Sequence, residues 1–295
     1  KIKAVVLNQM GVKLPYAASM PLSVEEVELD PPGQGEVLVK IAAAGLCHSD
    51  LSVINGDRPR PTPMVLGHEA AGIVEALGAG VDDLKKGDHV VMVFMPSCGH
   101  CLPCAEGRPA LCEPGGAANV AGTLLSGARR LKRGTTPLYH HMGVSAFAQY
   151  ATVSRRSLIK IETDLPLDEA ALFGCAVLTG VGAVLNTARV TPGSTVAVIG
   201  LGGVGLASVL GAILAGARRI VAIDLAEDKL KLAKNLGATE TFNAASPDCA
   251  EQVRAATEGG VEFAFELAGS VKAMELAYKI TRRGGTTVTA GLPPP

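Results

Sequence analysis

The chain has 295 residues, enough for two domains, and 48% of them are hydrophobic while 19% are charged, which argues against a disordered chain. Lys and Arg number 27 and Asp and Glu 28, so the net charge of −1 gives no sign of a nucleic-acid or membrane-surface partner. The N-terminal segment has only a short apolar run without a small-residue cleavage site, so we expect no signal peptide and a cytoplasmic protein.

The first 150 residues or so predict an all-β region with irregular loops, because short alternating or β-branched runs are separated by turn clusters. Residues 96–143 are rich in Gly, Pro and Cys and show little periodicity. So long a loop is unusual in a compact domain, and something other than apolar packing should hold it. The predicted strands are Lys3–Leu7, Val24–Leu29, Glu36–Ala43, Ala71–Leu77 and His89–Phe94.

From about residue 166 onward, strands alternate with helices, which predicts a doubly wound parallel sheet. The uncharged stretch Val196–Ala217 is long enough to cross a bilayer, but its crowded glycines favour a strand, a turn and a buried helix. The sequence stops after the fifth predicted strand of a six-stranded sheet type, so we expect a C-terminally incomplete chain. The predicted strands are Thr195–Gly200, Arg219–Asp224, Glu240–Asn243, Val261–Leu267 and Gly285–Gly291, and the predicted helices are Gly203–Ala215, Glu227–Leu236, Pro247–Thr257 and Val271–Ile280.

Four of the seven cysteines, Cys98, Cys101, Cys104 and Cys112, form a C-x2-C-x2-C-x7-C motif. An odd number of cysteines with this clustering fits metal ligands better than disulfides. Four thiolates in one short segment can surround a tetrahedral zinc ion and leave no open position, which indicates a structural site that holds the long loop. An iron–sulfur cluster is the alternative.

A glycine-rich turn follows the strand that ends at Ile199 and matches G-x-G-x-x-G over Gly200–Gly205. Such a turn lets a pyrophosphate approach the backbone at a helix N-terminus. Asp224 ends the next strand, and no Arg follows it directly. Its carboxylate can bind both ribose hydroxyls and would repel a 2′-phosphate, so the pattern favours NAD over NADP. The alternative is a plain turn with a surface Asp.

Three further candidate ligands are far apart in sequence: Cys47 in GLCHSD, His68 in GHEAAG and Cys175 in LFGCAVLTGVGA. Two sulfurs and one imidazole would leave a fourth coordination position for water or substrate, as in a catalytic zinc site. Spacing alone cannot unite them, since a single Cys is usually a small core residue.

These motifs occur in the order found in the zinc-containing medium-chain alcohol dehydrogenases, and the chain resembles that family over essentially its whole length, including Gly87–Val91 and His140–Tyr150. The resemblance implies an α/β fold class: a GroES-like, β-rich catalytic domain over residues 1–165, with a zinc lobe at about 96–113, and a Rossmann NAD-binding domain over 166–295. It further implies hydride transfer between a primary or secondary alcohol and NAD, giving an aldehyde or ketone. Two zinc ions per subunit and a homodimer or homotetramer are also implied.

The resemblance assigns roles to matching residues. Cys47, His68 and Cys175 would bind the catalytic zinc, and the four clustered cysteines the structural one. Asp50 would orient the histidine ligand, Glu69 would assist ligand exchange, and Ser49 would hydrogen-bond the alcohol. The expected cofactor contacts are His48 at the pyrophosphate, Thr179 and Val204 beside the nicotinamide, Asp224 and Lys229 at the ribose, and Gly200, Gly202, Gly203 and Gly205 in the turn; the expected pocket residues are Phe94, His141 and Met142.

Many members of the family end their proton relay at a histidine, and the matching residue here is Ser52, so the relay ends at Ser52, at His48 or in water. Other substrates within the family are a glutathione adduct, a polyol or an aromatic alcohol. A non-catalytic redox sensor that binds NAD and zinc is an alternative from another class. For the basic cluster Arg129, Arg130, Lys132 and Arg133 we expect a solvated loop, and for Cys249 an ordinary helix position.

Overall fold

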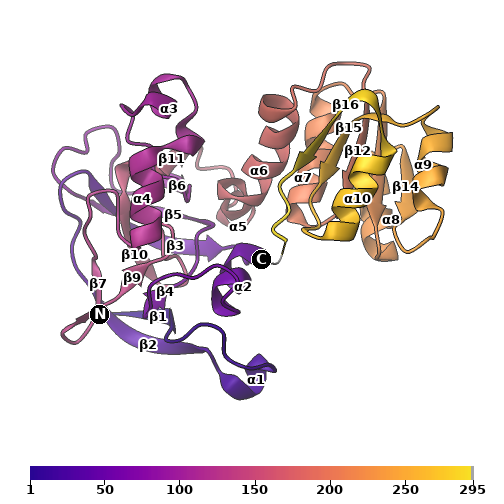
Figure 1. Cartoon of the computed structure of the whole chain (residues 1–295). Helices are drawn as coiled ribbons and strands as arrows, with labels where there is room; N and C mark the ends of the chain where they lie inside the picture. The colour runs from indigo at the N-terminus through magenta and orange to yellow at the C-terminus, as the bar shows by residue number, and fades with distance from the viewer. Residues whose placement is uncertain (294–295) are drawn as a thin grey trace. The chain divides into compact units, whose positions relative to one another are not determined.

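The computed structural model describes residues 1–293 and shows two compact units, which meet in the sequence between Cys175 and Ala176 (Figure 1). Residues 166–175, assigned to the second domain from the sequence, belong to the first unit. The reason is packing, because Ala170 and Ala171 are buried against Ala71 and Val91. This placement puts Cys175 at the end of the first unit.

The first unit is built on two sheets, as the alternating sequence pattern predicts. One has the strand order β8-β7-β2-β1-β4-β9, and the other, β10-β3-β5-β6-β11, is antiparallel throughout. Inward-facing residues such as Val37, Val39 and Val90 form a core on the second sheet. The strands are β1 (Ile2–Leu7), β2 (Leu22–Leu29), β3 (Glu36–Ala44), β4 (Met64–Val65), β5 (Ala70–Leu77), β6 (His89–Met92), β7 (Leu131–Arg133), β8 (Thr136–Pro137), β9 (Tyr139–His140), β10 (Tyr150–Ser154) and β11 (Leu158–Ile161), and the helices are α1 (Tyr16–Ser19), α2 (His48–Ile54), α3 (Leu102–Ala105), α4 (Glu113–Ala121) and α5 (Leu167–Ala170).

The expectation of a long irregular loop over residues 96–143 was wrong, since this segment contains α3, α4 and three short strands (Figure 1). The sequence pattern does not predict helix α4, because Gly115 and Gly116 have low helix propensity. The helix is stabilised instead by the caps at its two ends. The Cys112 sulfur accepts a hydrogen bond from the backbone N–H of Gly115, and Gly122 ends the helix with a φ of 67°.

The basic residues that follow α4 pair with carboxylates or, in the case of Arg129, lie over an aromatic ring. Glu36, only 1% exposed, accepts hydrogen bonds from Arg130 Nε at 2.8 Å and from Ser126 Oγ at 2.7 Å. Burial opposes the charge on Glu36, but these hydrogen bonds and that of Gly33 N–H leave its pKa lowered. The other pairs are Lys132 with Asp30, Arg133 with Glu25, and Arg129 over the ring of Tyr139.

His140, in the same region, makes the stability of the first unit depend on pH. Its Nε2 accepts a hydrogen bond from Arg130 N at 3.0 Å, and burial lowers its pKa to about 4. The unfolded state, with a pKa near 6.5, takes up a proton first as the pH falls. We therefore expect the free energy of unfolding to be lost between pH about 6.5 and about 4, by roughly 3 kcal/mol from this group. Above that window His140 adds no pH dependence.

Urea unfolding of the wild type and of a His140→Gln variant, measured across this pH range, checks the prediction. Glutamine keeps an acceptor oxygen near the position of Nε2 but does not titrate. The pH dependence of the variant should be shallower than that of the wild type below pH about 6.5. Parallel curves for the two proteins would contradict the assignment.

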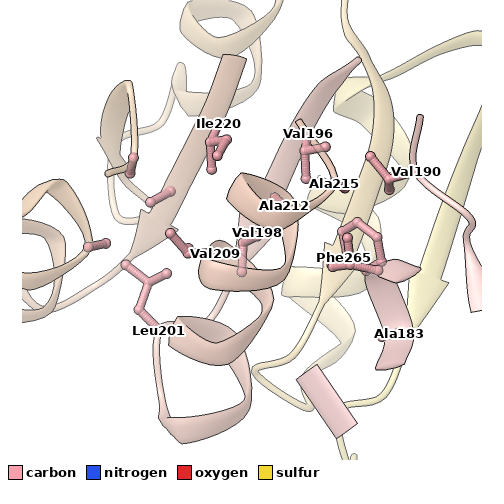
Figure 2. Packing of buried hydrophobic residues seen from close by; sticks show 14 of the residues in the cluster. Ala183, Val190, Val196, Val198, Leu201, Val209, Ala212, Ala215, Ile220 and Phe265 are labelled. Atoms are coloured by element: carbon pink, nitrogen blue, oxygen red, sulfur yellow. The ribbon is translucent and has the colours of Figure 1, made fainter. Parts of the chain in front are cut away.

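The second unit is a parallel sheet with the strand order β14-β13-β12-β15-β16, which confirms the predicted Rossmann arrangement. Alternate residues of β12 serve two cores: Val196 and Val198 lie on the side of α7 and α8 (Figure 2), and Ala197 and Ile199 on the side of α9 and α10. The elements are α6 (Ala176–Gly182), β12 (Thr195–Ile199), α7 (Gly203–Leu214), β13 (Arg219–Asp224), α8 (Glu227–Leu236), β14 (Glu240–Asn243), α9 (Cys249–Ala256), β15 (Val261–Glu266), α10 (Val271–Ile280) and β16 (Thr281–Thr289).

The apolar stretch Val196–Ala217 folds as β12, a turn and α7, as its glycines indicate. In the described part of the chain, no single helix has the length and apolar character needed to cross a membrane. Two consecutive helical segments, Leu167–Gly174 and Ala176–Thr187, meet at a bend of 53° and together reach that length and composition.

Candidate metal centres and cofactor site

Three loops of the first unit bring together Cys47, His68, Glu69 and Cys175. Cys47 precedes α2, the pair His68 and Glu69 lies between β4 and β5, and Cys175 follows a 3₁₀ turn. Their ligand atoms all lie within 4.8 Å of one another, and three of the four residues are buried. Residues that are remote in sequence thus share one small site.

The spacing of the two sulfurs fits a single metal ion. Cys47 Sγ and Cys175 Sγ are 3.9 Å apart, while two thiolates on one tetrahedral zinc ion should be separated by about 3.8 Å, given Zn–S bonds of about 2.3 Å. Contacts with Cys175 and His68 lower the pKa of Cys47 to about 3, so the site favours a thiolate, the form that binds metal. The donors present therefore fit zinc.

Asp50 holds the imidazole of His68 in a defined orientation. The carboxylate Oδ1 accepts a hydrogen bond from His68 Nδ1 at 3.2 Å and from the backbone N–H of Gly67 at 3.3 Å, while Oδ2 accepts from Cys47 N at 3.2 Å. Burial disfavours a charged His68, but the Asp50 and Cys47 contacts outweigh it and raise the pKa of His68 to about 10. With Nδ1 turned to Asp50, Nε2 is the ring nitrogen available to a metal.

Two rings flank His68. Phe94 meets it edge-on, with centroids 5.8 Å apart, and His141 does the same at 5.3 Å. Met142, the third expected pocket residue, follows His141 with a φ of 51°. Phe94 and His141 thus border the ligand cluster directly.

The residues of α2 that the resemblance linked to proton transfer lie in its first turns. Ser49 Oγ is 3.7 Å from Cys47 Sγ, beside the metal ligands. Ser52 is 2% exposed and its hydroxyl donates to the carbonyl of His48 at 3.0 Å, with His48 Nδ1 3.3 Å away. The His48 side chain is exposed.

The four clustered cysteines also form one site, with sulfur atoms within 4.8 Å of one another. Cys101 Sγ and Cys112 Sγ are 3.9 Å apart, again the spacing for one tetrahedral ion, whereas the cysteines of an iron–sulfur cluster bind different irons. Backbone N–H groups of His100 and Cys101 point at Cys98 Sγ and lower its pKa to about 6. The loop thus favours the thiolate form of Cys98 and brings four sulfur atoms close enough for a single ion.

In the second unit, the glycine pattern forms the tight turn that a dinucleotide requires. Gly200 has a φ of 89°, which favours glycine, and a Cβ on Gly205 would lie 1.8 Å from the carbonyl oxygen of Gly200. Apart from Gly202 itself and its two chain neighbours, no described residue has an atom within 4 Å of the place where a Cβ of Gly202 would sit, so the backbone there is open to a ligand. Gly203 begins α7.

Asp224 closes this turn from the next strand. Its carboxylate accepts hydrogen bonds from Leu201 N at 2.7 Å and from Ala226 N at 3.0 Å. Thr179 lies in α6 next to Gly180, where a Cβ would come within 2.3 Å of the carbonyl oxygen of Val204, so the helices carrying Thr179 and Val204 touch. Lys229 is exposed on α8.

Several glycines that make the metal site possible were not predicted from the sequence. A Cβ on Gly45 would lie 2.9 Å from the carboxyl carbon of Glu69, and one on Gly174 would lie 2.0 Å from the carbonyl oxygen of Met92. Gly67, with a φ of 91°, turns the chain just before His68. Their position beside each ligand was the available signal, since such glycines often mark close backbone approaches.

Comparison with known proteins agrees with this geometry. A family model described as the alcohol dehydrogenase GroES-like domain matches residues 33–163, and one described as zinc-binding dehydrogenase matches residues 203–295. The chain belongs to the zinc-containing medium-chain alcohol dehydrogenase family. Membership makes it an alcohol oxidoreductase that uses zinc and a nicotinamide cofactor and acts on small molecules.

Among solved alcohol dehydrogenases of this type, a zinc-binding domain protein from Burkholderia ambifaria is 37% identical, with a TM-score of 0.92, and the match covers 99% of this chain and 77% of that one. The benzyl alcohol dehydrogenase from Acinetobacter calcoaceticus is 35% identical, with a TM-score of 0.90 and the same coverage. A zinc-binding dehydrogenase from Sinorhizobium meliloti 1021, bound to NADP, is 30% identical, with a TM-score of 0.77, and the match covers 99% of this chain and 77% of that one.

Proposed function

We propose that this alcohol dehydrogenase oxidises a small alcohol to an aldehyde or ketone with NAD, and that each chain binds one catalytic and one structural zinc ion. The observation that carries the proposal is the set Cys47, His68 and Cys175, with its sulfurs 3.9 Å apart. Three protein ligands leave one coordination position for a substrate oxygen. A redox sensor without turnover does not need an open coordination position. The three-ligand site therefore favours an enzyme over a sensor.

The residues of the chain divide the chemical work. When bound, zinc lowers the pKa of the alcohol as a Lewis acid, and the nicotinamide accepts the hydride. Asp50 accepts the Nδ1 hydrogen of His68 at 3.2 Å and so keeps Nε2 available as a ligand. Ser49, whose Oγ lies 3.7 Å from a ligand sulfur, would accept the alcohol proton and release its own hydroxyl proton toward His48 or water. Phe94 packs edge-on against the ring of His68.

We propose that Ser52 is not the end of the proton relay. Its hydroxyl donates to the backbone carbonyl four residues earlier, as serines inside helices do, and the side chain is buried. Ser52→Ala should therefore change kcat for alcohol oxidation by less than about 3-fold, whereas loss of a proton-transfer group typically costs 100-fold or so. Steady-state kinetics from pH 6 to 9 test this, and a loss of more than about 10-fold would restore Ser52 to the relay.

The assignment of NAD rests on Asp224, because its carboxylate beside the glycine turn would repel a 2′-phosphate. Asparagine has the same shape without the charge. We expect Asp224→Asn to lower the ratio of kcat/KM for NAD to that for NADP by about 10- to 100-fold. Asp228→Asn, an exposed site on α8, is the matched control and should leave the ratio unchanged. An unchanged ratio in both variants would count against Asp224.

For the substrate, we propose a benzylic alcohol. The similarity to the Acinetobacter benzyl alcohol dehydrogenase supports this, as does the aromatic wall that Phe94 places beside the metal ligands. NADH absorbance should rise fastest with benzyl alcohol in a panel that includes ethanol and sorbitol, on protein that contains about two zinc ions per chain. NAD binding without turnover of any alcohol would overturn the proposed function. We also propose a homodimer or homotetramer, which light scattering tests.

A further inference from the structure

The carboxylate of Asp50 is shared by two buried imidazoles. Its Oδ1 lies 3.2 Å from Nδ1 of His68 and also 3.2 Å from Nδ1 of His141. Both histidine side chains are 1% exposed, and the two rings meet edge to face at an interplanar angle of 88°. His141 therefore touches both the metal ligand His68 and the group that orients it.

The two contacts with Asp50 differ in kind. His68 makes a hydrogen bond of good direction, whereas His141 Nδ1 has no aligned hydrogen-bond partner among residues 1–293. A buried polar nitrogen is rarely left in this way. The carboxylate of Asp50, 3.2 Å away, compensates this nitrogen by attraction to an N–H on Nδ1.

The backbone around His141 is fixed to the segment that carries His68. Ser145 Oγ accepts a hydrogen bond from His141 N at 2.9 Å and donates one to the carbonyl of Val65 in β4, also at 2.9 Å. Met142 and Ser145 both have positive φ values, 51° and 55°. Strained residues of this kind persist only where the surroundings hold them, often at functional sites. The loop thus keeps His141 in one place relative to β4.

We propose that His141 is a positioning residue of the catalytic metal site, which holds Asp50 and His68 in the orientation that presents Nε2 to a metal ion. This inference rests on the proposed zinc site of Cys47, His68 and Cys175. It gives His141 a role in metal affinity in addition to that of a pocket wall. Phe94, on the other side of His68, offers packing without a polar atom and provides the comparison.

Asparagine and glutamine at position 141 test which ring nitrogen of His141 matters. The Asn amide can reach the position of Nδ1, and the Gln amide can reach the position of Nε2. The measurement is metal affinity, from competition between the cobalt-loaded protein and a chelator, followed by cobalt absorption. We expect His141→Gln and His141→Phe to weaken the three-ligand site by about 10-fold and His141→Asn to retain near wild-type affinity, as for other groups behind a metal ligand. Phe94→Leu should leave affinity unchanged.

The four-cysteine site serves as the internal reference, because its cobalt should be released at the same chelator concentration in every variant. Equal affinity of the three-ligand site in the Asn, Gln and Phe variants, with changes in KM alone, would overturn the inference and leave His141 a pocket residue. A wild-type protein that binds cobalt only at the four cysteines would instead overturn the proposed catalytic site itself.

Discussion

Replacing Cys175 with serine is expected to lower alcohol oxidation by at least about 1,000-fold, because a catalytic metal contributes several kcal/mol of transition-state stabilisation. The Cys175 sulfur lies 3.9 Å from Cys47 Sγ, and a serine hydroxyl is a poor zinc ligand at neutral pH. Zinc content should fall from about two ions per chain to about one. The fold and NAD binding should persist, since the glycine turn belongs to the second unit. Metal analysis, NADH formation and an NADH fluorescence titration measure these three quantities.

Cys249→Ser is the matched control for this experiment. Cys249 is also buried, at 3% exposure, but it packs in the core between the sheet and α9 and lies in none of the candidate metal clusters of the described residues. Its replacement should leave zinc content and turnover unchanged. Turnover near the wild-type value in the Cys175 variant would remove the three-ligand set from the mechanism.

The second large effect is expected at the four-cysteine lobe. Cys112 is 2% exposed, and its sulfur accepts hydrogen bonds from Cys98 N at 3.2 Å and Gly115 N at 3.3 Å, so it supports both the lobe and the start of α4. We expect Cys112→Ser to lose the structural zinc and to lower the melting temperature by about 10 °C, because a structural metal contributes folding free energy. Thermal unfolding together with metal analysis measures both.

His100→Ala, which alters an exposed side chain within the same lobe, should change neither quantity. The Cys112 variant should still bind NAD, and the molecules that remain folded should retain turnover. A variant that keeps its full zinc content and its melting temperature would show that the lobe is stable without the Cys112 ligand.

Local patterns predicted the second unit well because its signals are short-range. The run from Thr195 to Gly205 specifies a buried strand, a tight turn and a helix within eleven consecutive positions. Strand β16 was less well predicted, since it begins at Thr281, before the expected Gly285, where its pairing with β15 is irregular. The earlier start of β16 depends on its pairing with β15, so the local sequence does not predict it.

The metal site shows the opposite case. Nothing in the spacing of Cys47, His68 and Cys175 places them together, and only the order of motifs in a resembling family suggested it. The contact of His141 with Asp50 could not be predicted at all, because it depends on the path of a loop held by Ser145 and Val65. Helix α4 was hidden for a related reason, since its stability comes from the caps at Cys112 and Gly122.

The backbone at Met142 restricts which side chains this loop position accepts. A φ of 51° costs any L-residue some strain, and the cost is greatest for branched side chains such as valine, isoleucine and threonine. Asparagine and glycine accept this conformation readily. A library at position 142 will therefore be filtered by conformational tolerance, whereas position 94, which is not among the described residues with positive φ, carries no such restriction.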